Sequence, residues 1–192
     1  AALWGGLLAS SYAFMQFIFS PSVGALSDIF GRRPILLIAL TLLFVDYIIM
    51  GFASSIVLLF CGRLVAGVAG GTVTTATAYL ADISEPEMKK KNFAIIGAAF
   101  GLGFILGPSI GGILGEFSIR APFFISAGFA LSNFILCYFF LPESLDPTKR
   151  NNSKLESLNP LANILKIVKV KSLRKIFFCF FLIAFANTVY PA

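Results

Sequence analysis

Two charged residues, Asp46 and Arg63, lie inside apolar stretches in which no other charge occurs. A charge at the centre of a bilayer costs roughly 2.5–3.5 kcal/mol on insertion scales, so each needs a partner or a function. Asp46 lies seven residues before Ala53, and Arg63 lies seven residues after Ile56. Two antiparallel helices would therefore hold both charges about 10 Å from the same membrane face. For Asp46 this leaves two interpretations open, a structural ion pair or a group that takes part in proton coupling.

A second concentration of charge is the sequence GALSDIFGRRP, residues 24–34, which interrupts apolar sequence on both sides. Its charged residues are Asp28, Arg32 and Arg33. Gly24 and Gly31 would permit close backbone approach or a positive φ, and Pro34 fits the first turn of a following helix. The acid and the arginines can form a charge-assisted hydrogen-bond cluster. A loop that only retained positive charge on one side of the membrane would need neither the acid nor the glycines.

A third pattern is the glycine-rich sequence of residues 97–115, in which glycine recurs at positions 103, 107, 111 and 115. In a membrane, this four-residue spacing creates a groove into which another helix packs closely. Pro108 removes a backbone hydrogen bond, so it is expected to kink or loosen the helix near its middle. A static helix interface would explain the glycines but not the proline among them.

The composition indicates an integral membrane protein. Of 192 residues, 58% are hydrophobic and only 12% are charged, more apolar surface than a soluble domain of this size can bury. The net charge of +6 comes from residues placed between the apolar stretches, so no nucleic-acid partner is expected. The chain has no histidine, no nucleophile beside a suitable base and no metal-ligand spacing. We therefore expect neither an enzyme nor a metal or other cofactor.

Five stretches reach the roughly 20 apolar residues that a membrane-spanning helix requires. They are residues 4–25, 35–53, 56–80, 92–115 and 122–141, and a sixth apolar stretch occupies 176–192. Short polar loops join the five, so neighbouring helices would be antiparallel. We predict an all-α, polytopic membrane helix bundle over residues 1–141. Four threonines lie in the second half of the third span. They would either line a polar cavity or form hydrogen bonds with the backbone of their own helix. They are Thr72, Thr74, Thr75 and Thr77.

The basic residues alternate between loops. The gaps 26–34, 81–91 and 142–175 hold two, three and eight of the 15 lysines and arginines, whereas 54–55 holds none and 116–121 holds one. By the positive-inside rule the three basic gaps are cytoplasmic. This orientation predicts a multi-pass protein of the inner (plasma) membrane, with the lipid bilayer as its surroundings.

The gap at 142–175 has two parts. Its first half is polar and rich in proline, asparagine and serine, and is typical of a flexible linker. Its second half places Leu161, Ile164 and Val168 at helical spacing opposite Lys166 and Lys169. This pattern predicts an amphipathic basic helix, either bound to an anionic membrane surface or serving as an ordinary connector.

The first span would run from outside to inside, yet Ala1 follows no polar leader, initiator methionine or signal-peptide region. The simplest expectation is a piece of a longer protein that lacks one upstream helix. Residues 176–192 would then be the truncated first helix of a second bundle. Numbered in the longer protein, the six apolar stretches would be helices 2 to 7.

Residues 24–34 resemble the loop signature that the major facilitator superfamily carries between helices 2 and 3. The matching positions are Gly24, Leu26, Ser27, Asp28, Gly31, Arg32, Arg33 and Pro34, and the chain departs at Ile29, where the family usually has a base. Arg63 with Gly67 resembles the family's helix-4 motif. The helix-5 antiporter motif is matched by Gly103, Gly107, Pro108, Gly111 and Gly112. Short motifs along most of the chain occur in the order found in bacterial tetracycline-efflux antiporters.

The resemblance implies the N-terminal half, without helix 1, of a twelve-helix major facilitator fold that works by alternating access. The implied function is export of an amphipathic drug such as a tetracycline in exchange for protons, powered by the proton gradient. Asp28 and Arg32 would form a cytoplasmic latch together with Gly24, Gly31 and Arg33. The helix-5 residues would form the contact between the two bundles, and Asp46 and Arg63 would carry the intramembrane charge function. We expect a monomer that binds its small-molecule substrate and protons.

Two other functions remain in view. A membrane receptor on the same scaffold would need neither the intramembrane charges nor the antiporter glycines. An importer or exporter of sugars or other metabolites would generally lack the helix-5 motif.

Overall fold

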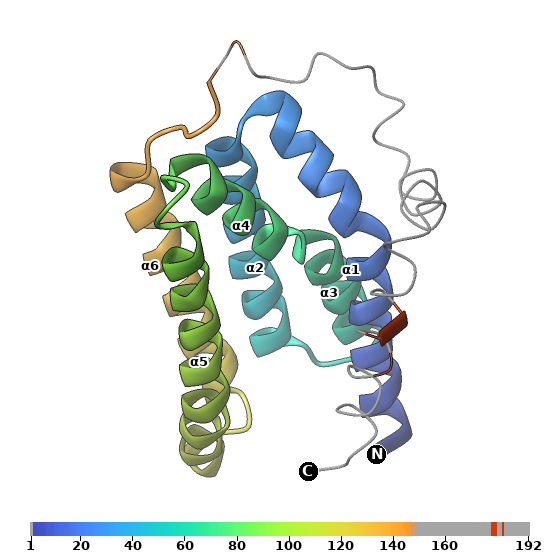
Figure 1. Ribbon diagram of the computed structural model, residues 1–192. Coiled ribbons are helices and arrows are strands. Elements are labelled where there is room, and N and C mark those ends of the chain that lie inside the picture. The colour runs from blue at the N-terminus through green and yellow to red at the C-terminus, as the bar shows by residue number, and fades with distance from the viewer. Residues whose placement is uncertain (1, 147, 149–177, 180–181, 183–192) are drawn as a thin grey trace.

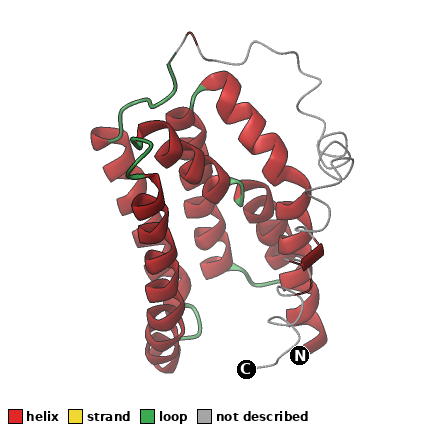
Figure 2. Cartoon of the chain, viewed as in Figure 1, coloured by secondary structure: helices red, strands yellow, loops and turns green. Residues whose placement is uncertain are grey.

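The computed structural model describes residues 2–146, 148, 178, 179 and 182, and every regular element within this part is a helix (Figures 1 and 2). The helices are α1 (Ala2–Phe30), α2 (Arg32–Phe52), α3 (Ile56–Ala69), α4 (Thr72–Ile83), α5 (Lys89–Phe117) and α6 (Ala121–Phe140). They provide five stretches long and apolar enough to cross a membrane, one of which α3 and α4 form together. The predicted all-α membrane class is confirmed.

Helix α1 continues further than the sequence suggested. Residues 26–30 were expected in a loop, but they form its last turns, and only Gly31 separates α1 from α2. The Gly31 N–H closes α1 by donating to the carbonyl of Ser27 at 3.2 Å. The polar residues after position 25 mark the end of the apolar stretch but not the end of the helix. The helical backbone hydrogen bonds continue to Gly31. The predicted loop 26–34 is therefore wrong in its extent.

The third span is interrupted, where the sequence suggested one continuous helix over 56–80. Helix α3 ends at Ala69 and α4 begins at Thr72, with Gly70 and Gly71 between them. The Gly70 N–H donates to the carbonyl of Gly67 at 3.1 Å, a tightened turn typical of a helix end. After proline, glycine is the least favourable residue within a helix, so the pair explains the site of the break.

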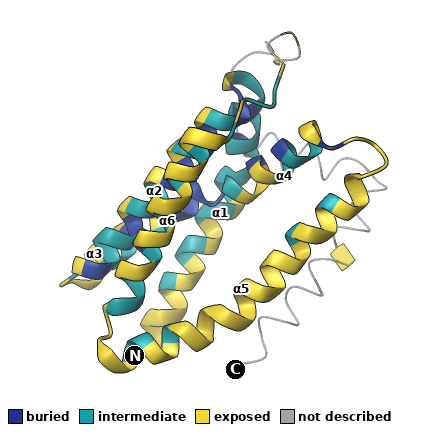
Figure 3. Cartoon of the chain, turned by 90° about the vertical axis from the view of Figure 1, so that its left-hand side faces the viewer, coloured by how far each residue is buried: buried dark blue, intermediate teal, exposed yellow. Residues whose placement is uncertain are grey.

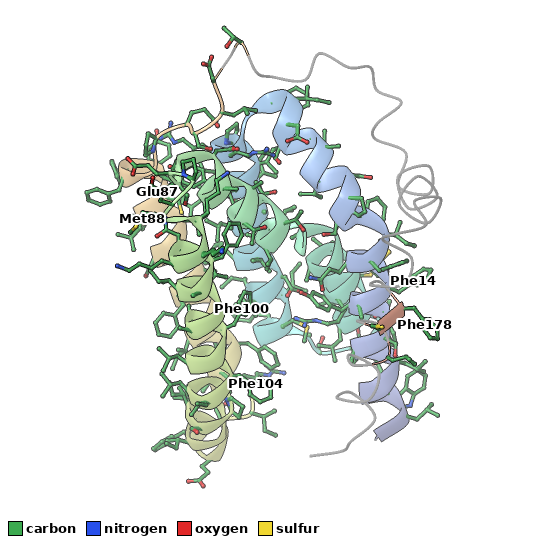
Figure 4. All side chains as sticks on the ribbon, in the orientation of Figure 1. Phe14, Glu87, Met88, Phe100, Phe104 and Phe178 are labelled. Carbon is green, nitrogen blue, oxygen red and sulfur yellow. The ribbon has the colours of Figure 1, made fainter. Side chains whose placement is uncertain are left out.

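The packing is the inverse of that in a soluble protein. The largest fully buried side chains are Thr75, Asp46 and Ser27, and the buried apolar residues are largely alanines and leucines. By contrast Phe100 and Phe104, which protrude from α5 in Figure 4, are 57% and 82% exposed. Small and polar residues between helices, with large apolar residues outside, are what a bundle surrounded by lipid requires.

The helices form one closely packed group and one separate helix. The most extensive packing joins α2 with α6 and α1 with α3. Figure 3 shows the buried residues concentrated in this group, with α5 lying apart and carrying no buried residue of its own. The expected linker helix and the last apolar stretch fall almost entirely outside the described residues, so the division at 142 and 176 stays a prediction.

Candidate functional site

One end of the bundle holds a charge cluster around Arg32, formed with Asp28, Asp82 and Glu143. The Arg32 guanidinium donates from Nη1 to Asp28 Oδ1 at 2.6 Å and from Nε to Asp82 Oδ2 at 3.1 Å. Nη1 also lies 2.6 Å from the hydroxyl of the fully buried Ser27. The Arg32 side chain is 10% exposed, so its bonds to carboxylates are charge-assisted and shielded from solvent on most sides. We call Asp28, Arg32, Asp82 and Glu143 the Arg32 cluster.

Glu143 closes this cluster from the far end of the described chain. Its carboxylate accepts from the backbone N–H of Arg32 at 2.8 Å and of Arg33 at 3.2 Å. These are the first two residues of α2, whose N–H groups have no partner inside the helix. Negative charge at a helix N-terminus is also favoured by the helix dipole. Glu143 thus acts as the cap of α2, and it fixes the segment after α6 against the start of α2.

Arg33 is held separately. Its Nη2 donates to the carbonyl of Tyr138 at 2.6 Å, and the guanidinium lies 5.8 Å from the centre of the Tyr138 ring. Of the five predicted latch residues, Asp28 and Arg32 therefore share a cluster directly, whereas Arg33 contacts α6. Gly31 has the φ of 105° that the sequence suggested for a glycine there, and Gly24 lies against Thr74 Cγ2, which is 3.5 Å from the site of a Cβ.

Sequence reasoning missed Asp82 and Glu143 as members of this cluster. Their bonds to Arg32 span 50 and 111 residues of chain, a separation that local spacing cannot bridge. A usable signal existed nevertheless. Both acids lie at helix ends on the side predicted to be basic, and an acid next to several arginines and lysines is a candidate partner for one of them.

A second charged site lies within the membrane-spanning helices. Arg63 Nη2 of α3 donates to Asp46 Oδ2 of α2 at 2.8 Å, with Asp46 1% exposed and Arg63 23% exposed. The two residues that the sequence placed at equal depth therefore face each other. Among the residues that the structure describes, neither Asp46 Oδ1 nor Arg63 Nε has a hydrogen-bond partner. The ion pair is buried but incompletely satisfied, a costly arrangement for a purely structural pair.

Neighbouring residues shape this ion pair. A Cβ at Gly62 would come within 2.8 Å of Asp46 Oδ1, so glycine at this position leaves room for the carboxylate. The Arg63 guanidinium lies 5.7 Å from the centre of the Tyr12 ring of α1, within the range of a cation–π contact. The site therefore joins three helices, and a change in the charge of Asp46 would be felt by α1 and α3 as well as by α2.

The glycines of α5 are exposed to open space. A Cβ at Gly103, Gly107, Gly111 or Gly112 would meet no described atom within 4 Å. Pro108 lies inside α5, which runs without interruption from Lys89 to Phe117. Gly107 and Gly111 border a hollow of about 230 Å³ between α5 and α6. The glycine groove thus exists, and among the described residues no helix is packed into it.

The Arg32 cluster and the ion pair of Asp46 with Arg63 thus lie on helices that could cross a membrane, and the separate helix α5 carries open glycines. Residues 4–192 match the sequence profile of the Major Facilitator Superfamily. The chain belongs to this family. Together with the five candidate membrane spans, this membership identifies a multi-pass membrane chain, as the sequence motifs suggested.

Individual members of the superfamily are similar to the chain over most of its length. The tetracycline resistance protein, class C, of Escherichia coli is 41% identical over 158 residues, which cover 82% of this chain and 40% of that protein. The class B protein of Escherichia coli is also 41% identical, over 151 residues that cover 79% of this chain and 37% of that protein. The crystal structure of the human organic anion transporter MFSD10 (TETRAN) superposes with a TM-score of 0.74 at 32% identity, covering 86% of this chain and 40% of that one. The chain thus spans about two fifths of the length of these superfamily members.

Proposed function

We propose that the full-length protein exports an amphipathic, tetracycline-like drug across the inner (plasma) membrane in exchange for protons. Two of the most similar relatives carry names that state tetracycline resistance. The membership in the superfamily supports an alternating-access mechanism, in which two bundles rock about a central site. The proton gradient is then the energy source.

The observation that carries the proposal is the buried ion pair between Asp46 and Arg63. An antiporter needs an acid inside the membrane that loses and gains a proton as the protein changes state. Asp46 is 1% exposed, and a hydrogen bond of 2.8 Å links it to Arg63. Its Oδ1 has no hydrogen-bond partner within the described part of the chain. When Arg63 stays near, the carboxylate is stabilised as an anion; when Arg63 moves away, the same carboxylate in an apolar site favours the protonated form. A rearrangement of α2 against α3 would therefore couple conformation to proton binding.

In this proposal the Arg32 cluster is a cytoplasmic latch. It stabilises the access state in which α1, α2, α4 and the segment after α6 are held together, and it breaks in the other state. The glycines of α5 form the surface that contacts the second bundle. The basic segments 26–34, 81–91 and 142–175 lie on the cytoplasmic side, consistent with the positive-inside rule.

A second candidate is transport of an organic anion, which the name of the human structural relative suggests. Arg63 would be the group that attracts an anion into the membrane. Against this, the positive charge of Arg63 is already paired with Asp46 at 2.8 Å. An anion would have to replace Asp46, which costs the protein a buried ion pair.

The test uses everted membrane vesicles that contain the full-length protein and have an acidic interior. Tetracycline added outside should be taken up and should drive protons out of the vesicles, which a pH-sensitive dye reports. Vesicles without the protein and vesicles treated with a proton ionophore serve as controls. Absence of proton release on addition of tetracycline would contradict the proposal. Release on addition of an organic anion, with none on addition of tetracycline, would favour the second candidate.

A further inference from the structure

Helix α1 carries polar side chains at four-residue intervals on the face that contacts α3 and α4. Residues four apart lie on the same side of a helix, one turn above another. Tyr12 lies under the Arg63 guanidinium, the Gln16 Nε2 donates to the carbonyl of Gly70 at 3.3 Å, and the Ser20 hydroxyl lies 2.8 Å from that of Thr74. We call Gln16, Ser20 and Thr74 the polar seam. It continues from the intramembrane ion pair towards the Arg32 cluster.

The polar seam lies beside the interruption between α3 and α4, with Gln16 bonded to Gly70 and Ser20 bonded to Thr74. Gly70 lies 14 residues after Ile56 and 13 before Ile83, which places it about 20 Å from either end of this span. The α1 backbone and side chains approach so closely here that a Cβ at Gly67 or Gly71 would lie 2.5 Å from Met15 Cβ or Val23 Cβ. The break therefore lies at mid-depth and brings peptide groups next to the side chains of α1.

An interrupted helix at membrane depth is tolerated where it is buried in protein or lines a cavity. In secondary transporters, binding sites near the midplane are typically formed by helices that are unwound there. Here Gly70 and Gly71 keep helical φ and ψ, so the break is a tightened turn whose Gly70 carbonyl accepts a hydrogen bond from Gln16. Thr74 is exposed, and Ser20 and Gln16 are half-buried. Polar groups at this depth generally face the bundle interior or a water-filled cavity, and the three seam residues bond between helices, whereas an isolated hydroxyl can bond its own helix.

The chemistry of the seam defines what it can recognise. Its three side chains are an amide and two hydroxyls, which carry no charge and which both donate and accept hydrogen bonds. The Gln16 amide has two donor hydrogens and an acceptor oxygen, more than its bond to Gly70 uses. The charged groups lie elsewhere: Arg63 is seven residues, about 10 Å, from Gly70. A ligand at the seam is therefore held through neutral oxygen or nitrogen groups.

We propose that Gln16, Ser20 and Thr74 contact the transported molecule, and that they select for carbonyl, hydroxyl or amide groups on an otherwise apolar skeleton. This inference rests on the proposed efflux function. It assigns substrate contact to the seam, whereas proton coupling stays with Asp46 and Arg63. The alternative is that the seam only holds α1 against α4.

The two roles can be separated at Thr74, because valine retains its shape without the hydroxyl and serine retains the hydroxyl without the methyl group. Tetracycline-driven proton release from everted vesicles gives KM and the maximal rate for each variant, at matched amounts of protein. Thr74→Val should raise KM for tetracycline roughly two- to tenfold, the effect of one lost neutral hydrogen bond, with a nearly unchanged maximal rate. Thr74→Ser should behave as the wild type.

Thr41→Val is the matched control, because the Thr41 hydroxyl is exposed on α2 and bonds the carbonyl of Leu37 in its own helix. It should leave KM unchanged. Gln16→Met, which removes the amide at nearly constant size, provides an independent second site and should also raise KM.

The outcomes are distinct. An active wild type in which neither Thr74→Val nor Gln16→Met changes KM would overturn substrate contact and leave the efflux function intact. A fall in the maximal rate at constant KM, not restored by Thr74→Ser, would show a purely structural seam and overturn the inference as well. A wild type that releases no protons with tetracycline would overturn both proposals.

Discussion

The carboxylate of Glu143 occupies the position that a side chain at Gly31 would need. A Cβ built at Gly31 would overlap this carboxylate, which accepts hydrogen bonds from the backbone of Arg32 and Arg33. The two residues are far apart in sequence, yet each determines what the other position can hold. Glycine at residue 31 is therefore required twice, once for its φ of 105° and once for the space that Glu143 fills.

Gly31→Ala is predicted to destabilise the protein. At φ 105° and ψ 156° the backbone is in a region that is essentially restricted to glycine, with a cost of about 1–3 kcal/mol for other residues. Displacing Glu143 would add the loss of a helix cap, about 1 kcal/mol. The melting temperature of the purified protein in detergent should fall.

Two variants test this explanation. Gly128→Ala on α6, where a Cβ would meet no described atom within 4 Å, should leave the melting temperature unchanged or raise it. In a Glu143→Ala background, Gly31→Ala should cost less than it does alone, because the two effects share one contact. Strict additivity of the two substitutions would refute the steric link between Gly31 and Glu143.

The sequence predicted some of these relationships and missed others for physical reasons. The depth of Asp46 and Arg63 could be calculated because a helix advances by a constant rise per residue. The need for glycine at residue 31 followed from the turn between two helices. The partners of Arg32 could not be derived, because Asp82 and Glu143 reach it only through the packing of α2 with α4 and α6. The break at Gly70 was missed because glycine also serves as a packing residue within continuous membrane helices.

Asp28→Asn is predicted to impair transport with little effect on stability. The Asp28 carboxylate is 46% exposed, and exposed ion pairs contribute only about 0.2–1 kcal/mol. The latch, however, acts on the free-energy difference between the two access states. Because this difference is itself small, the loss of one ion pair can shift the balance between the states. Uptake of tetracycline into everted vesicles should fall while the melting temperature changes little. Glu87→Gln, at an exposed acid before α5, is the control and should transport normally. Unchanged efflux by Asp28→Asn would contradict the latch.

The ion pair between Asp46 and Arg63 predicts a specific result for paired substitutions. Removing one partner of a buried pair costs about 3–5 kcal/mol, because it leaves the other charge unpaired. Asp46→Asn and Arg63→Gln alone should each lower stability and abolish exchange. Combined, they should restore much of the stability, because both charges are gone, but exchange should stay absent, because no acid remains. Recovery of proton exchange in the neutral double variant would mean that the pair is structural only.

The charge swap Asp46→Arg/Arg63→Asp adds a test of direct contact. If the two side chains interact as the 2.8 Å distance indicates, the swapped protein should be more stable than either single swap. A swapped protein no better than both single variants would remove the support for direct pairing.

Gly107→Leu on α5 is predicted to abolish exchange or to make the membrane leak protons. It should not disturb the packing among helices α1 to α6. Glycine is less favourable than alanine in a helix by roughly 0.8–1.0 kcal/mol, and leucine ranks close to alanine. A Cβ at Gly107 would meet no described atom within 4 Å. Among the described residues there is room for a Cβ at Gly107, and the hollow of about 230 Å³ beside it can take more of the leucine side chain. A loss of function would have to come from a surface that approaches α5 as the transporter changes state. Gly128→Leu places the same side chain at another open glycine, on α6, and should retain exchange. Proton flux with and without tetracycline separates a blocked protein from a leaking one, and normal exchange by Gly107→Leu would rule out the glycines of α5 as a contact between bundles.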